Sequence, residues 1–435
     1  MSAQPKISQR RRREVLDALR RGSVPEAGLG QLAVGLTPFA ATLGAELDVV
    51  KGGSGVFKVA RGEYGSGKTF FARWLAERSL RAGFAASELQ VNEIETPLYR
   101  LDAVYRQCIS GIRTSSVPRG GFRQLIDAWL YTIESDAYEQ GRAFDDVLDR
   151  RLAVVAATAP VFPQVIRAYR KASESGDRDV ADGLISWLGG QPNISAAIKR
   201  AAGVKGDLDN RMALEFLRGV VTIMRDSGHA GLFLVIDEVE TVQRMRRDSR
   251  EKSLNVLRQL VDQISDGSFS GLYLMVTGTP AFLEGQMGIA SLPPLAQRLH
   301  TEFGSNPKFD NPRAPQIRLT GFDAAKLLEL GGRVRDLYVA GADNADRVGA
   351  RVDDAFLEVF GRAVAGQLGE RVGLAPRLYI RKLVDVMDKI DIHAEFDPYA
   401  DYELELSLDE LTPQERAIVT GTEARATLTA DDIAL

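Results

Sequence analysis

The segment that most constrains the fold is Gly62-Glu63-Tyr64-Gly65-Ser66-Gly67-Lys68-Thr69, which has the form G-x-x-x-x-G-K-T. Glycines at these positions let the backbone turn tightly enough to aim several N–H groups at one anion. An apolar run at 56–60 precedes the segment, and apolar residues at helical spacing follow it as far as Arg81. The sequence therefore predicts a strand, a loop and a helix, with the loop at the helix N-terminus, where the helix dipole favours phosphate.

Such a loop binds the phosphates of a nucleotide such as ATP. Lys68 is expected to reach the β- and γ-phosphates, and the Thr69 hydroxyl is expected to hold Mg²⁺. The alternative interpretation is a glycine-rich surface turn. The candidate nucleotide-binding residues are Gly62, Glu63, Tyr64, Gly65, Ser66, Gly67, Lys68, Thr69 and Phe70.

Composition limits the kind of protein. The chain has 435 residues, of which 45% are hydrophobic and 26% charged, so we expect a globular protein of two or three units. The net charge of −4 excludes a globally basic surface, so any contact with nucleic acid must be local. The single cysteine, Cys108, fits a reducing cytoplasm, and no run of about 18 apolar residues predicts a membrane span. We therefore expect a cytoplasmic protein without a membrane partner.

A second motif lies far along the chain. Residues 231–236 form a continuous apolar run that is closed by Asp237 and Glu238, as in a central parallel strand followed by a Walker B acid pair. We expect Asp237 to bind Mg²⁺ and Glu238 to orient and polarise the attacking water. The alternative is a strand that is followed by an acidic turn without a catalytic role. The phosphate loop that precedes it in the same chain favours the Walker B interpretation over this alternative.

Further strands and helices define the fold class. Residues 87–92 and 271–280 suit buried strands, and most of the segments between the strands suit helices. This alternation predicts an α/β protein, a P-loop NTPase core whose parallel sheet is flanked by helices and whose ligands sit at the carboxyl ends of the strands. Residues 48–55 are expected to turn into the first strand.

The order of these features resembles that of AAA+ ATPases. The resemblance implies that Thr277, rather than Thr279, is the sensor that helps to place the water. It also implies that Arg298 is an arginine finger that reaches a neighbouring subunit, and that Arg377 is the sensor of a helical lid. A homo-oligomer follows from the finger. The alternatives are a surface ion pair for Arg298 and a solvent-facing first-turn arginine for Arg377.

The chain is more specifically similar to the ATP-binding proteins of bacterial BREX (Pgl-type) phage-defence systems, BrxD-like. The residues that carry this similarity lie at 19–35, at 61–70 (R-G-E-Y-G-S-G-K-T-F) and at 235–238. The similarity runs from about residue 8 to residue 389. It implies antiviral defence beside a DNA methyltransferase, a helicase or other BREX proteins.

The expected domains follow from these motifs. Residues 1–50 form an N-terminal segment, in which 22–35 is a candidate wall for the adenine ring, with a plain connecting loop as the alternative. Residues 51–320 form the ATPase core, with a helical insertion at about 97–227. A helical lid is expected at 321–395, and an acidic tail with one helix capped by Thr412, Pro413 and Glu415 at 396–435.

One cluster could contact DNA. Five cations fall within nine residues after the acid pair: Arg244, Arg246, Arg247, Arg250 and Lys252. In a ring assembly such a cluster would follow a phosphate backbone. The alternative is a solvent-exposed helix face without a binding role, whose charge is balanced by nearby acids. The run Arg10 to Arg13 is a second candidate with the same alternative. The histidines lack metal-ligand spacing, so no metal beyond Mg²⁺ is expected.

These features favour a Mg²⁺-dependent ATP hydrolase that acts as an oligomeric motor or switch on DNA in phage defence. A nucleotide-gated interaction module with little turnover, an adaptor for a helicase or another defence protein, is the alternative of a different class. A small-molecule P-loop kinase is weaker, because it leaves the acid pair, Arg298 and Arg377 without a joint explanation.

Overall fold

The computed structural model describes residues 7–368, 376–404 and 416. The chain divides into two compact units. One, here called the loop unit, comprises Met1–Thr42, Ala60–Glu77 and Glu302–Leu435; the other, the sheet unit, comprises Leu43–Val59 and Arg78–Thr301. Because each unit has its own buried apolar core, each is described by itself.

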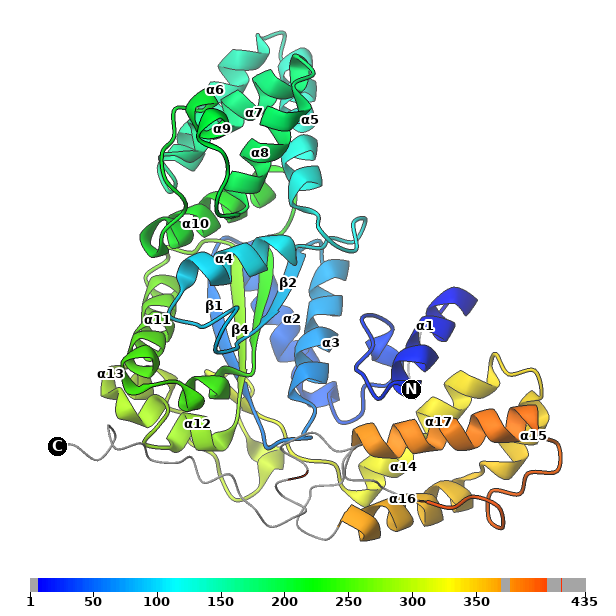
Figure 1. Ribbon diagram of the computed structural model, residues 1–435. Coiled ribbons are helices and arrows are strands. Elements are labelled where there is room, and N and C mark those ends of the chain that lie inside the picture. Colours follow the sequence, from blue (N-terminus) through cyan, green and yellow to red (C-terminus); the bar gives the residue numbers. More distant parts are fainter. Residues whose placement is uncertain (1–6, 369–375, 405–415, 417–435) are drawn as a thin grey trace. The chain divides into compact units, whose positions relative to one another are not determined.

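The strands form one five-stranded sheet in the order β2-β3-β4-β1-β5, which confirms the α/β class (Figure 1). The pairs β2–β3 and β3–β4 are parallel. The strand β1 passes from the sheet unit into the loop unit. The strands are β1 (Val56–Arg61), β2 (Ala85–Gln90), β3 (Leu232–Asp237), β4 (Leu272–Gly278) and β5 (Gln316–Arg318).

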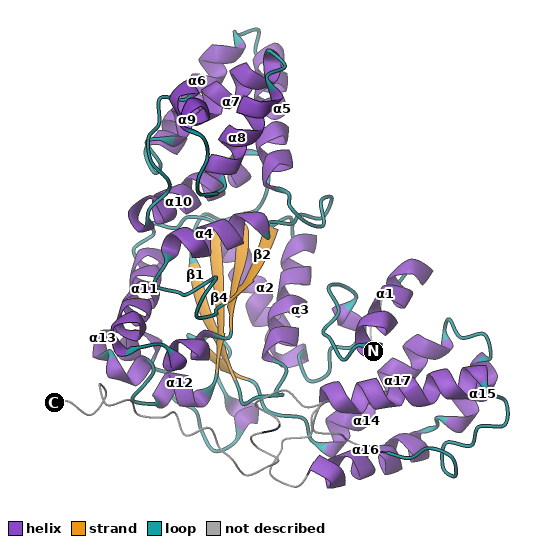
Figure 2. Ribbon diagram, in the orientation of Figure 1, coloured by secondary structure: helices purple, strands orange, loops and turns teal. Residues whose placement is uncertain are grey.

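In the sheet unit, β3 and β4 are buried along their whole length, because both of their faces are apolar. The helix α4 (Leu101–Ser110) packs against β2, and α11 (Arg247–Ser265) flanks the strands (Figure 2). The other elements of this unit in the second half of its chain are η2 (Val239–Arg244), α12 (Pro280–Glu284), η3 (Ile289–Ser291) and α13 (Pro293–Leu299).

The chain between β2 and β3 is mostly helical, as predicted. Asp209 caps α10 (Asn210–Asp226) through an N–H bond from Met212 at 2.9 Å, and the apolar stripe of α10 packs on α4. The remaining helices between β2 and β3 lie on the side of α4 and α10 that faces away from the sheet (Figure 1). These are α5 (Phe122–Glu139), α6 (Phe144–Ala156), α7 (Phe162–Glu174), α8 (Arg178–Leu188) and α9 (Ala196–Ala201).

In the loop unit, α1 (Gln9–Arg20) packs on α17 (Pro376–Ile392) and α14 (Ala324–Val339). The Arg20 guanidinium donates to both carboxylate oxygens of Asp388 at 2.7 and 2.8 Å, and the Tyr338 hydroxyl donates to the same carboxylate at 2.7 Å. This network joins the three helices. The unit also contains η1 (Leu29–Gln31), η4 (Pro307–Phe309), α15 (Ala345–Arg351) and α16 (Asp354–Leu368).

Two expectations about the strands are corrected. The strand expected at 87–92 is Ala85–Gln90, because Asn92 accepts three N–H bonds from residues 94–96 and so closes a turn. Residues 48–51 do not turn toward the first strand; they end α2 (Thr37–Lys51), whose apolar side is Leu43, Leu47 and Val50.

In the tail, residues 402–404 are not in a strand, and the predicted capped helix at Thr412, Pro413 and Glu415 lies outside the described residues. In the part of the chain that is described, no helix combines the length and the apolar character needed to cross a bilayer.

Candidate functional site

The phosphate loop has the predicted setting between a strand and a helix. The strand β1 ends at Arg61 directly before Gly62, and α3 (Lys68–Arg81) begins at Lys68. Gly65 and Gly67 have φ angles of +77° and +88°, a region that other residues enter only with strain. At Gly62 a Cβ atom would lie 2.3 Å from the Ser66 hydroxyl. The backbone conformation therefore favours glycine at 65 and 67, and close packing favours it at 62.

Lys68 is buried and folds back over the loop. Its ammonium donates to the carbonyl oxygens of Gly62 at 2.9 Å and Glu63 at 3.3 Å, and it lies 5.0 Å from the centre of the Tyr64 ring. A cation enclosed by a glycine loop at the start of a helix suits an anionic ligand. The Thr69 hydroxyl follows on the same helix and offers the oxygen that Mg²⁺ prefers, so the residues fit a magnesium–nucleotide complex.

The loop unit also holds neighbours of the loop that the sequence did not reveal. The Phe322 ring lies 4.0 Å from the position of a Cβ on Gly67, and both Phe322 and Phe70 pack on the apolar core that α1, α14 and α17 share. No local pattern marks Phe322 as a loop neighbour, because about 250 residues separate it from Gly67.

The segment at 22–35, the candidate adenine wall, is fixed to α3. The Glu77 carboxylate accepts N–H bonds from Gly28 at 2.9 Å and Leu29 at 3.0 Å, and Arg73 donates to the Val24 carbonyl at 3.0 Å. Arg333 of α14 donates to the Ala33 carbonyl at 2.8 Å. The segment thus bridges the helix of the phosphate loop and α14; contact with adenine stays a prediction.

Arg377 begins α17 as expected, at its second residue. Its Cγ lies 3.6 Å from the position of a Cβ on Gly22, in the turn that follows α1. The residue is therefore placed against the N-terminal segment, and its role as a sensor stays a prediction.

The acid pair lies in the sheet unit at the carboxyl ends of adjacent strands. The β3–β4 register pairs Ile236 with Val276, so Asp237 and Thr277 are neighbours. The fully buried Thr277 hydroxyl donates to Asp237 Oδ1 and accepts the N–H bond of Glu238 at 3.0 Å. The acid pair and Thr277, which were predicted from two separate segments, are thus brought together. Thr279 instead caps α12 with its hydroxyl, which favours Thr277 as the polar end of β4.

Glu238 has an unusual backbone and a partner that sequence reasoning missed. Its φ and ψ angles are +57° and +47°, a left-handed conformation that costs about 1–3 kcal/mol for a residue with a side chain. Its Oε2 accepts a 2.6 Å hydrogen bond from the Gln90 amide, at the end of β2. The signal for Gln90 was its polar side chain at a strand end, but only the β2–β3 register places it beside the acid pair.

Arg298 lies on α13 at the surface of the sheet unit, with 42% of its side chain exposed. It forms an ion pair with Asp262 of α11 and donates to the Pro294 carbonyl at 2.9 Å. The expected finger is therefore held by its own chain in this state. Its reach into a neighbouring subunit stays a prediction.

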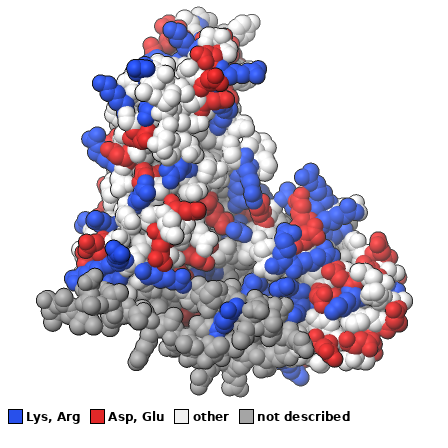
Figure 3. Space-filling model, viewed as in Figure 1, with Lys and Arg blue, Asp and Glu red and all other residues white. Residues whose placement is uncertain are grey.

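The expected basic cluster is only partly exposed. Arg250 is buried and donates to the Met245 carbonyl at 3.2 Å, and Arg247 pairs with Glu251 at 3.1 Å. The exposed members without a carboxylate partner among the described residues are Arg244, Arg246 and Lys252. A second gathering of cations covers α1 (Figure 3), where Arg10 pairs with Glu14. In the described residues no His, Cys, Asp or Glu cluster of three or more is arranged to hold a metal.

The parallel sheet, the glycine loop and the Asp237–Glu238 pair define a protein of the P-loop nucleotide-binding class. The profile of the family described as BREX system ATP-binding protein BrxC/D matches residues 7–406. The chain therefore belongs to that BREX family, which confirms the similarity expected from the sequence. A search of curated proteins gives no match.

Proposed function

We propose that this chain hydrolyses ATP with Mg²⁺ and works as an AAA+ type oligomeric motor or switch on DNA in BREX defence. The observation that carries the proposal is the arrangement at the ends of β3 and β4. Binding of a nucleotide needs the loop and a metal ligand, but it does not need a strained glutamate beside Asp237 and Thr277. A carboxylate fixed there suits a residue that orients water.

Each residue of the predicted set has a role in the proposed reaction. The loop and Lys68 would bind the phosphates, Thr69 and Asp237 would hold Mg²⁺, and Glu238 would act on the water. The bound metal would neutralise charge that develops on the transferred phosphoryl group. Arg298, from a neighbouring subunit, and Arg377 would complete the set.

The contact with DNA rests on local charge. Arg244, Arg246 and Lys252 extend from η2 and α11, directly after the acid pair in the chain. Cations at these positions would bind a DNA phosphate backbone. DNA would then contact a segment that directly follows Glu238 in the chain. A helicase or another BREX protein is the proposed protein partner, because the family is defined by its defence system.

The test is the rate of ATP hydrolysis measured across protein concentration, with and without duplex DNA, beside a mass measurement in ATP. A rate per chain that rises with concentration and with DNA supports the oligomeric motor. A rate that is flat in both variables, with tight ATP binding, would refute it.

One observation favours the second candidate, a nucleotide-gated interaction module with little turnover. Glu238 is bound to Gln90 and Arg298 to Asp262, so neither side chain is poised for catalysis in this state. In such a module ATP would order the surface on which a helicase or another defence protein docks.

The variant Gln90→Leu separates the two candidates, because it removes the donor and keeps a side chain of similar size. If Gln90 restrains a catalytic Glu238, the DNA-independent rate should rise about tenfold, the effect of a lost hydrogen bond to a charged group. Steady-state phosphate release measures it, with Gln124→Leu on the exposed side of α5 as a control. An unchanged, near-zero rate favours the module.

A further inference from the structure

A groove of about 750 Å³ lies in the sheet unit at the edge opposite the acid pair. Its lining includes residues just before the strands: Gly83 before β2, Ala230 before β3 and Ser270 before β4. Residues of α6 and α10 form the other side. The groove therefore lies at the amino ends of the strands, whereas Asp237 and Thr277 lie at the carboxyl ends.

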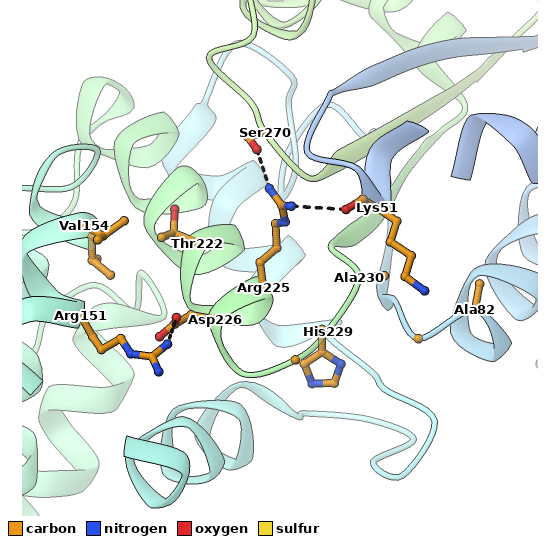
Figure 4. Close-up of a pocket in the computed structure, with 13 residues that line it drawn as sticks. Lys51, Ala82, Arg151, Val154, Thr222, Arg225, Asp226, His229, Ala230 and Ser270 are labelled. Atoms are coloured by element: carbon orange, nitrogen blue, oxygen red, sulfur yellow. Dashed lines mark hydrogen bonds and ion pairs between the residues drawn. The ribbon is translucent and has the colours of Figure 1, made fainter. Parts of the chain in front are cut away.

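The central side chain of the groove is Arg225, near the end of α10 (Figure 4). It donates to the Ser270 hydroxyl at 2.6 Å and to the Lys51 carbonyl at 3.3 Å. A Cβ on Gly271 would lie 2.4 Å from Arg225 Cδ, so glycine at 271 is needed to admit the side chain. The guanidinium is thus held in one place and has further N–H donors to spare.

The charge of the groove is unbalanced. Asp226, the one acidic residue among the described residues of its lining, is bound by Arg151 and by the Trp129 indole N–H at 2.7 Å. Among the described residues, neither Lys51 nor Arg225 forms an ion pair with a carboxylate. Two cations without counter-charges therefore line the same space as His229 and Thr222.

From this arrangement we infer that the groove binds a small phosphorylated molecule, separately from the ATP site. A volume of 750 Å³ matches sites for small ligands. Arginine, with its planar fork of N–H donors, and lysine, with its long flexible stem, are the usual donors to phosphate oxygens. The apolar lining residues Val154, Val155 and Ala230 offer contacts to the rest of the ligand.

A competing explanation is the helix dipole. Lys51 and Arg225 fall in the last turns of α2 and α10, where cations are favoured without any ligand. That effect accounts for the charges but not for the space between them. Lys171 is a matched control, since it is an exposed last-turn lysine on α7 that does not line the groove.

The experiment is calorimetric titration of the full chain with inorganic pyrophosphate. The wild type should bind two equivalents, and Lys68→Ala, which disables the phosphate loop, should retain one. Adding Lys51→Gln to Lys68→Ala should weaken that binding about five- to tenfold, the loss of one charged hydrogen bond near the surface. Adding Lys171→Gln should leave it within about twofold.

Three results would overturn the inference. Lys68→Ala could bind no pyrophosphate, the two lysine variants could behave alike, or a short single-stranded oligonucleotide could displace the pyrophosphate. The last result would assign the groove to nucleic acid. Circular dichroism checks that each variant is folded, and Lys51 is exposed, so its replacement should not affect folding.

Discussion

Glu238 is the residue at which backbone strain and chemistry coincide. We expect Glu238→Gln to bind ATP within about threefold of the wild type while turnover falls at least about 100-fold, because the amide cannot accept a proton from water. Calorimetry measures the first quantity and steady-state phosphate release the second. Glu139→Gln, an exposed change at the end of α5, is the control. Hydrolysis at the wild-type rate in the Glu238 variant would remove the residue from its proposed role.

Cys108 shows how a buried side chain is made inert. Burial raises the pKa of its thiol to about 12, so the reactive thiolate is scarce at neutral pH. The native chain should therefore resist iodoacetamide at pH 8 over hours and become alkylated once urea unfolds it. Mass spectrometry of the intact chain reads the added group. Rapid alkylation of the folded chain would show that α4 opens readily.

At the scale of elements, a buried ion pair joins α2 to the sheet within the sheet unit. The Lys58 ammonium, 2% exposed, lies 2.5 Å from Glu46 Oε1, and the buried Tyr273 hydroxyl donates to Glu46 Oε2 at 2.7 Å. Burial, and after it the nearby Glu46 carboxylate, raise the pKa of Tyr273, so its hydroxyl stays protonated as a donor. The three side chains connect α2, β1 and β4.

Removing one partner of this pair should be costly. Glu46→Leu removes a carboxylate that contacts both the buried Lys58 ammonium and the Tyr273 hydroxyl, and we expect the free energy of unfolding to fall by about 3–5 kcal/mol. The double variant Glu46→Leu and Lys58→Met should recover only part of that loss, because the buried Tyr273 hydroxyl still loses its acceptor. Urea denaturation followed by circular dichroism measures both. A loss in the double variant equal to that in the single one would contradict the argument.

The elements themselves were largely predictable from sequence. The apolar runs of β3 and β4 and the helical stripes between residues 97 and 227 follow from local periodicity, which each segment carries by itself. The helix α2 was not predicted, because its apolar stripe is narrow. The turn expected at 48–55 also overlaps the last residues of this helix. The short α9 buries none of its residues, so no periodic signal was present.

The candidate site was predictable only where it is a motif. The loop and Asp237-Glu238 are contiguous strings, but Gln90 and Phe322 contribute through strand register and packing across long chain separations. The ion pair of Arg298 with Asp262 likewise joins α13 to α11. The sequence around either residue does not indicate which residue it pairs with. Such contacts depend on the tertiary fold, and the local pattern of residues around each position does not reveal them.

At the scale of the whole molecule, the proposed oligomer makes a prediction that a monomer cannot satisfy. If Arg298 acts on the ATP of a neighbour, a site needs Lys68 from one chain and Arg298 from another. The ion pair with Asp262 is half-exposed, and such pairs contribute only about 0–1 kcal/mol, so assembly can displace it at little cost.

Lys68→Ala and Arg298→Ala should each be nearly inactive alone. An arginine finger contributes about 10³- to 10⁵-fold to turnover, and loss of the loop lysine removes nucleotide binding. When the two variants are mixed, the Lys68 variant supplies intact Arg298 to sites whose Lys68 is intact. The rate should then recover to about a quarter of the wild type in random assemblies, and the double variant Lys68→Ala and Arg298→Ala, mixed with either single variant, should restore nothing. A finger that acts within its own chain gives no recovery in any mixture. A mass measurement verifies that mixed assemblies form. If they form and the rate does not recover, Arg298 does not belong to a site shared between chains.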